Sequence, residues 1–267
     1  MSLLISGDLR LRNTWQPMDT DAAAYITDVE TADGQALEER VKIAIDNFVL
    51  GCKADGIWPA IKASCILAGA RTLAGALIPL AGTAPTNFNF VDGDYNRKTG
   101  LVGDKSTRYL DSNRNNDDDP QDNQHLSCFI TTYPASLSSA LMGSGVFSDS
   151  GNSYLLRGSN ISVKSQTGGS VAIIGPNSDP VGLFGVSRNN NSNFSYRLIG
   201  VNNLASFASV TPRFNGNTLV FARGTTVSPD QRTNARLAFY SIGESLDLAL
   251  LDTRVTTLIN AFAAAIP

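Results

Sequence analysis

The sequence predicts a mainly β protein, an antiparallel jelly-roll sandwich with an N-terminal arm, a short helical section and a C-terminal helix. Two observations lead to this fold class. From Phe88 onward, short apolar and β-branched runs recur roughly every ten residues. Glycine, asparagine and aspartate separate these runs, and the 23 glycines of the chain suit a fold with many turns. Helical periodicity is confined to residues 19–56 and to the C-terminal end.

Composition describes an ordinary folded chain and excludes several functions. The 267 residues are 42% hydrophobic and 17% charged, enough for one large β domain with an extension. A net charge of −3 provides no basic field for nucleic acid, so nucleic-acid binding is not expected. The three cysteines, Cys52, Cys65 and Cys128, are odd in number and far apart, which predicts buried free thiols made in a reducing cytoplasm.

Residues 1–18 are predicted to form the N-terminal arm. Leu3, Ile5, Leu9 and Leu11 stand among polar residues in an alternating pattern, and Trp15 follows. Such a segment either docks on its own domain or adds to the edge of a neighbour's sheet, so Leu9 and Trp15 are candidate assembly residues. Residues 1–8 have no basic n-region and their apolar run stops after three residues, so they do not predict a secretory signal.

Residues 19–56 are predicted to be helical. Asp19 or Thr20 can cap a first helix, which Gly34 ends. A second helix carries an apolar stripe that must be buried, either on the sandwich or on sister copies of the chain. Its candidate assembly residues are Leu37, Val41, Ile45 and Phe48. A homo-oligomer, with a trimer favoured, is the corresponding expectation.

Residues 57–267 are predicted to form the sandwich with its closing helix. The run from Ile57 to Leu80 allows strand or helix, and its charged residues and prolines make a membrane span improbable by composition. Asn215-Gly216 is the sharpest hairpin signal. The segments expected to be strands after Phe129 are 145–147, 154–156, 161–163, 171–174, 182–186, 196–199, 206–210, 219–222 and 237–242.

The closing helix has one apolar face, which either caps the sandwich or contacts another subunit. This face consists of Leu251, Val255, Leu258, Ile259, Phe262 and Ile266.

The order of two motifs resembles a known family. Residues 100–112 read GLVGDKSTRYLDS, and after a polar loop residues 125–134 read HLSCFITTYP. This order is similar to the opening strands of the concanavalin A-like, laminin-G-like jelly rolls found in bacteriophage virion proteins. Residues 181–188, 217–223 and 236–246 fall where that family has its later strands and closing turn. The resemblance implies a fold and a viral context, and it favours a first strand soon after Ile57; one fold hosts many functions.

No catalytic constellation stands out in the sequence, so an enzyme is not expected. The glutamates are Glu30, Glu38, Glu39 and Glu244, and none forms the Glu-x-Asp-x-x-Glu strand of jelly-roll glucanases. Glu244, with Asp247, is predicted to cap the closing helix. His125 is the only histidine, which argues against a triad or a multi-histidine metal site; it is expected to start a strand and make local hydrogen bonds.

Two asparagine-rich loops are candidate ligand sites, with ordinary solvated loops as the alternative. The first loop runs from Asn113 to Asp122, and its candidate binding residues are Asn113, Asn115, Asn116 and Asp117. Asp117, Asp118 and Asp119 offer hard oxygen ligands that would suit calcium, but their spacing is not that of an EF-hand and adjacent side chains cannot all point at one ion, so a solvated loop is favoured here. The second loop runs from Asn189 to Asn193. Amide-rich loops beside aromatic rings suit sugars, and its candidates are Asn190, Asn191, Asn193, Phe194 and Tyr196.

These features favour a non-enzymatic phage structural protein, made in the host cytoplasm and carried in the virion. The leading hypothesis is a tail-fibre or receptor-binding component that presents a lectin-like sandwich to host-surface glycans and contacts other virion proteins through its arm. A capsid decoration or cement protein, or a baseplate or neck component, is the alternative. A polysaccharide-degrading enzyme is a remote third, because it depends on fold analogy alone.

Overall fold

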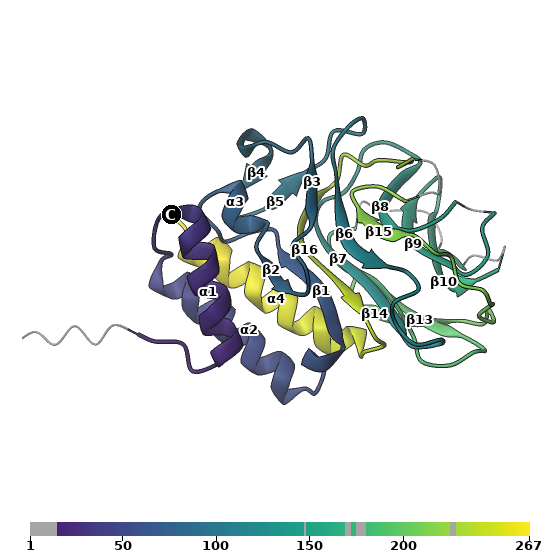
Figure 1. Ribbon diagram of the computed structural model, residues 1–267, viewed down its shortest axis with the longest axis horizontal. Helices are drawn as coiled ribbons and strands as arrows, with labels where there is room; N and C mark the ends of the chain where they lie inside the picture. The colour runs from purple at the N-terminus through teal and green to yellow at the C-terminus, as the bar shows by residue number, and fades with distance from the viewer. Residues whose placement is uncertain (1–14, 147, 169–171, 175–179, 225–227) are drawn as a thin grey trace, which may run out of the picture.

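The computed structural model describes residues 15–146, 148–168, 172–174, 180–224 and 228–267. Two antiparallel sheets pack face to face in this part of the chain. The long helices α1 (Thr20–Asp33), α2 (Glu39–Ala54) and α4 (Leu248–Ala265) lie together on one side of the sandwich (Figure 1). The predicted mainly β antiparallel sandwich with a C-terminal helix is therefore confirmed.

Sheet A carries the helices and sheet B lies on its other side. In spatial order sheet A contains β14 (Val201–Ala205), β13 (Phe194–Leu198), β12 (Gly182–Arg188), β7 (Gln124–Thr132), β16 (Arg236–Gly243), β1 (Ile61–Ile66) and β2 (Pro79–Ala81), while β5 (Gly100–Val102) joins β16 and β4 (Tyr95–Asn96) joins β5. Sheet B contains β11 (Ala172–Ile174), β10 (Ile161–Thr167), β9 (Asn152–Arg157), β8 (Ser139–Gly143), β15 (Asn217–Val220), β6 (Tyr109–Asn115) and β3 (Thr86–Phe88). The short helices are α3 (Leu73–Ala76), η1 (Trp58–Ala60) and η2 (Asp92–Asp94).

The central strands of sheet A are buried on both faces because they separate two hydrophobic cores. On β7, Leu126 and Cys128 belong to the core between the sheets, whereas Phe129 belongs to the core beneath the helices. This alternation follows from the two-residue repeat of a strand. The three cysteines are buried free thiols, as predicted, and burial raises the pKa of Cys52 and Cys65 to about 12.

The helical section of residues 19–56 shares one core with sheet A. Asp19 caps α1, and its carboxylate accepts a hydrogen bond from the Asp21 backbone N–H at 2.8 Å, which confirms the predicted start of this helix. The apolar stripe of α2 lies in the core with α4 and Phe239. The boundary at residue 56 therefore separates secondary-structure types, while the packing on either side of it is continuous.

This packing corrects the assembly prediction for α2. Leu37, Val41, Ile45 and Phe48 are each at most 4% exposed inside their own chain, so they are not available to a neighbouring subunit. Trp15 is partly buried against the same core. Leu9, with the rest of residues 1–14, lies outside the described residues.

The closing helix α4 caps the sandwich with the predicted apolar face. Leu251, Val255, Leu258 and Phe262 are buried against α2 and sheet A. The helix is long and apolar enough to cross a membrane by length and composition, a test that core helices also pass. Its N-cap is Asp247, whose carboxylate accepts from the Ala249 N–H at 2.7 Å, so the predicted capping role of Glu244 is wrong.

Several local expectations are resolved by the strand pairing. Residues 57–80 form η1, β1, α3 and the start of β2, so the predicted first strand is present. The predicted strand at residues 206–210 is wrong, because the edge strand β14 ends at Ala205. Asn215-Gly216 does not make a hairpin, since β15 pairs with β6 and β8, which lie far away in sequence. The predicted segments 145–147 and 171–174 each include a residue outside the described ones.

Candidate functional site

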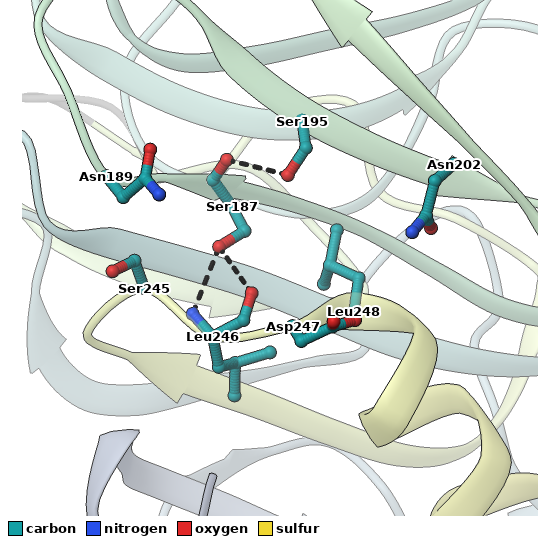
Figure 2. A pocket seen from close by; sticks show the side chains of 8 residues that line it. All are labelled: Ser187, Asn189, Ser195, Asn202, Ser245, Leu246, Asp247 and Leu248. Atoms are coloured by element: carbon teal, nitrogen blue, oxygen red, sulfur yellow. Dashed lines mark hydrogen bonds between the residues drawn. The ribbon is translucent and has the colours of Figure 1, made fainter.

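A polar pocket of about 410 Å³ lies beside the N-terminal end of α4 (Figure 2). Strands β12 and β13 provide Ser187 and Ser195, and the edge strand β14 provides Asn202. The loop after β12 adds Asn189. The opposite wall is the turn from β16 into α4, which consists of residues 245–248.

The position of α4 explains why this part of sheet A is polar. On β12, Phe184 and Val186 point into the core between the sheets, whereas Leu183 belongs to the core beneath the helices. Ser187 follows Leu183 on that same face by the alternation of the strand. It contacts the turn that precedes α4, where a hydroxyl finds hydrogen-bond partners.

Hydrogen bonds fix the wall of the pocket to its floor. The Ser187 hydroxyl donates to the Leu246 carbonyl at 2.8 Å and accepts from the Leu246 N–H at 3.1 Å. Ser195 donates its hydroxyl hydrogen to the Ser187 carbonyl at 3.1 Å. Figure 2 shows these bonds converging on Ser187. The pocket is therefore preformed by its own residues.

The beginning of β7 supports the same wall from behind. The Asn123 side-chain oxygen accepts from the Ser245 N–H at 2.7 Å and from the Ser245 hydroxyl at 2.6 Å. His125 is fully buried, and its Nδ1 lies 2.5 Å from the Glu244 carbonyl oxygen. Because a carbonyl can only accept, Nδ1 carries the proton, and Nε2 accepts from the Ser241 hydroxyl at 2.7 Å.

His125 is thus a buried, neutral part of the scaffold. Burial lowers its pKa to about 4. It lies at the start of β7, as predicted, but its partners are on the neighbouring strand and in the following turn, which are distant in sequence.

Four polar groups at the pocket remain available to a ligand. Asn189 and Asn202 each accept a hydrogen bond through the side-chain oxygen, from Asn190 at 2.9 Å and from Arg197 at 2.8 Å. Their NH₂ groups have no partner among the described residues. Asp247 uses Oδ1 for both capping bonds, which leaves Oδ2, and the Ser195 hydroxyl can still accept.

The charges near the pocket disfavour an anionic ligand. Among the described residues that line it, Asp247 alone is charged, and it occupies the N-terminal end of α4 where an anion would otherwise be favoured. The nearby Arg197 is paired with Asp252 at 2.7 Å. The arrangement therefore suits an uncharged ligand that both donates and accepts hydrogen bonds.

The first asparagine-rich loop is occupied by its own structure. Asn116 is fully buried and donates to the Gly151 and Phe214 carbonyls at 2.9 and 3.1 Å. Asn115 accepts from the Asp117 N–H at 2.9 Å, and Asn113 donates to the Ala84 carbonyl at 2.8 Å. The predicted ligand role of Asn116 is wrong because its side chain is inaccessible, and Asn113 and Asn115 have structural partners.

The three adjacent aspartates of this loop do not form a common ion site. Asp117 pairs with Arg213 at 2.5 Å, and Asp118 accepts from the Asn115 N–H at 2.8 Å. Asp119 is 2% exposed and pairs with Arg114. No group of three or more His, Cys, Asp or Glu residues within the described ranges is arranged to hold a metal. The three carboxylates therefore have separate partners, and the calcium site considered for them as the alternative to a solvated loop is not supported.

The second loop borders the pocket through Asn189, which was not among the predicted binding residues. Asn190 accepts from the Asn193 N–H at 3.0 Å and shapes the turn, while Asn191 is exposed away from the lining residues. Phe194 is buried, and the Arg188 guanidinium carbon lies 5.3 Å from the centre of its ring, so a sugar cannot stack on it. Tyr196 packs against the core between the sheets.

The pocket residues missed by sequence reasoning are Ser187, Asn189, Ser195, Asn202 and Ser245. The sequence signal that could have indicated the pocket is Ser187, a serine on the face of β12 where Leu183 is apolar. A serine at such a place is common in turn-rich sequences, and only the strand register brings these side chains together.

Glu244 lacks the environment of a catalytic acid. Its carboxylate pairs with Lys62 at 2.9 Å and accepts from the Asn123 amide at 3.0 Å. The Lys62 hydrogen bond, followed by the Asn123 bond, lowers the pKa of Glu244. A general acid for glycoside hydrolysis needs the opposite shift.

No protein-family model matches the sequence, and no curated protein matches it. Solved structures with a related fold include the HCR/D W1238A mutant (12% identity, TM-score 0.48, covering 74% of this chain and 52% of that chain). The botulinum neurotoxin serotype D binding domain gives 13% identity and a TM-score of 0.47, with 74% and 50% covered. The sialidase CBM40 of Ruminococcus gnavus gives 8% identity and a TM-score of 0.40, with 51% and 83% covered.

This chain spans about half the length of the first two of these structures. At such low identities and TM-scores, the likeness supports no inference about function.

Proposed function

We propose that this chain is a non-enzymatic binding protein whose polar pocket holds a neutral, hydroxyl-rich ligand, namely a glycan of a host surface. The supporting observation is the set of groups left available at the pocket: two amide NH₂ donors, from Asn189 and Asn202, and two acceptors, from Ser195 and Asp247. Sugar hydroxyls donate and accept, so they can satisfy both kinds of group.

The size and composition of the pocket set the expected affinity. A volume of about 410 Å³ lies within the usual range for small-molecule sites. Three neutral hydrogen bonds worth about 1 kcal/mol each and one to the Asp247 carboxylate worth about 1.5 kcal/mol would give a Kd on the order of 1 mM for a single site. A binding protein with such a site gains from presenting several copies at once.

The position of the protein in a virion is the second part of the proposal. The resemblance to phage jelly rolls supports a tail-fibre or receptor-binding component that holds its sandwich toward the host, with the arm contacting other virion proteins. A capsid decoration or neck protein is the second candidate, and the exposed apolar edge of β14 favours it, because lattice proteins need such contacts.

A glycan array probed with the intact chain tests the binding proposal. We expect retention on neutral oligosaccharides, without preference for sialylated or sulfated ones, because the pocket lacks a cation. Absence of binding to every glycan would overturn the proposal. Release of reducing ends from a bound polysaccharide would show catalysis and contradict the non-enzymatic part.

Imaging of purified virions tests the location. Density for this chain at a fibre tip is the expected result, whereas density on the capsid lattice or in the neck would replace the receptor-binding role with the structural one.

A further inference from the structure

The edge strand β14 exposes apolar side chains to solvent. It is the last strand of sheet A and pairs with β13 alone among the described strands. Val201 is 57% exposed and Leu204 is 63% exposed, and the preceding turn adds Ile199 at 55%. These are among the most exposed large hydrophobic residues in the described part of the chain.

Nothing in the sequence of β14 protects this edge. The strand reads VNNLA, with no charged residue and no proline. Proteins usually block a free edge with lysine, proline, a bulge or a covering segment, since its unpaired backbone groups accept another strand. An edge with two exposed apolar side chains is therefore a site for strand addition.

The apolar surface continues from the edge into a groove of about 500 Å³ beside α4. Ile199 and Gly200 line the groove together with Leu183 and Ile259, and Val181 at its rim is 58% exposed. This groove offers space for side chains of an added strand.

The arm has the pattern that such an edge accepts. Leu3, Ile5, Leu9 and Leu11 alternate with other residues. Residues 1–14 lie outside the described part, and an extended segment of that length reaches about 46 Å. That is more than twice the roughly 17 Å along the five residues of β14.

The point where the arm leaves the fold favours a second copy as the acceptor. Asp46 accepts from the Met18 and Asp19 N–H groups at 3.1 and 3.0 Å, and Trp15 packs against the helical core. The chain therefore leaves beside α1 and α2, on the side of the molecule away from β14 (Figure 1). The arm of a neighbouring molecule can approach β14 without crossing the helices.

We propose that the arm segment Leu3–Leu11 of one copy adds as a strand to β14 of a second copy. Backbone hydrogen bonds to β14 would give affinity, and the apolar side chains of the arm, which share one face of a strand, would lie beside Leu204 on the face that carries the helices. The contact joins two different surfaces, so reciprocal exchange of arms gives a closed dimer, and one-way exchange gives a larger ring or a filament. The inference does not require the glycan proposal, because it uses the backbone edge of β14, although Asn202 of this strand also lines the pocket.

Sedimentation velocity of the full chain and four variants tests this contact. The arm variant is Leu9→Asp with Leu11→Asp, and the edge variant is Val201→Lys with Leu204→Lys. We expect the wild type to associate and each variant to weaken association by about a hundredfold. The controls Ser6→Asp and Ser206→Lys should associate like the wild type.

A mixing experiment separates an exchanged arm from other contacts. The arm variant keeps an intact edge and the edge variant keeps an intact arm, so each alone should be monomeric and their mixture should form a heterodimer. A mixture that stays monomeric would overturn the proposal. So would a monomeric wild type whose β14 amides become exposed to hydrogen exchange in the arm variant, because the arm would then cover its own edge.

Discussion

The two asparagine-rich loops are similar in sequence but have different structural roles. In the loop of residues 113–122, the buried Asn116 holds two backbone carbonyls and Asp119 is paired with Arg114. In the loop of residues 189–193, the backbone is held from beneath by Arg188, which donates to the Asn190 and Asn193 carbonyls at 3.0 and 3.1 Å. Most polar side chains of the first loop are used within the fold, whereas the second loop is held mainly by Arg188 and by the Asn190 side chain.

The difference teaches that a polar loop becomes a site only when its side chains are not needed for its own structure. The first loop pairs Asp119 with Arg114 and Asp117 with Arg213, and the residue that follows it, Asn123, supports Ser245 in the pocket wall. The second loop leaves the Asn189 NH₂ group to the pocket. The first loop thus supports the pocket wall, and the second loop forms part of the pocket rim.

The largest expected effect is on the free energy of unfolding, and it concerns the first loop, which supports the pocket wall. Asp119→Ala leaves Arg114 without its partner in a mostly buried place, and should reduce the free energy of unfolding by about 3 kcal/mol. The matched change Asp117→Ala removes a carboxylate that is 45% exposed and should cost less than about 1 kcal/mol. Urea denaturation of both variants measures the difference. Equal losses would show that the first loop is an ordinary surface loop.

The next effect concerns His125, which joins the support to the pocket wall. An unfolded histidine has a pKa of about 6.5. Burial lowers the pKa of His125 to about 4 in the folded state, so the unfolded chain gains its proton first as the pH falls. The stabilisation is complete above pH 6.5, and about 2 kcal/mol should be lost between pH 6.5 and 5.

The control for this prediction is His125→Gln, which has no titrating group at the same place. Its unfolding free energy should lose this part of the pH dependence over that window. An unchanged slope in the variant would assign the pH dependence to other groups.

The fold was largely predictable from local patterns, whereas the site was not. The cap at Asp19, the apolar face of α4 and most strands follow from spacing and side-chain type. The hairpin expected at Asn215-Gly216 fails because long-range pairing overrides local turn propensity: the Asn116 N–H donates to the Gly216 carbonyl at 3.0 Å. The turn propensity of a short segment does not show which distant residues will form hydrogen bonds with it.

The pocket escapes prediction for the same reason. Its residues come from β12, β13, β14 and the turn before α4, and they meet only through the register of sheet A. Asn189 and Asn191 are equivalent in sequence terms, and only the fold directs the first toward the pocket.

Replacement of one exposed asparagine, Asn189, gives the most direct test of the pocket as the binding site. Calorimetric titration with the best neutral glycan should show that Asn189→Ala weakens binding about fivefold, because one ligand hydrogen bond worth about 1 kcal/mol is lost, while stability is unchanged. Asn191→Ala, in the same loop but outside the pocket lining, should bind like the wild type. Equal affinities for the two variants would place the ligand elsewhere and contradict the pocket as the binding site.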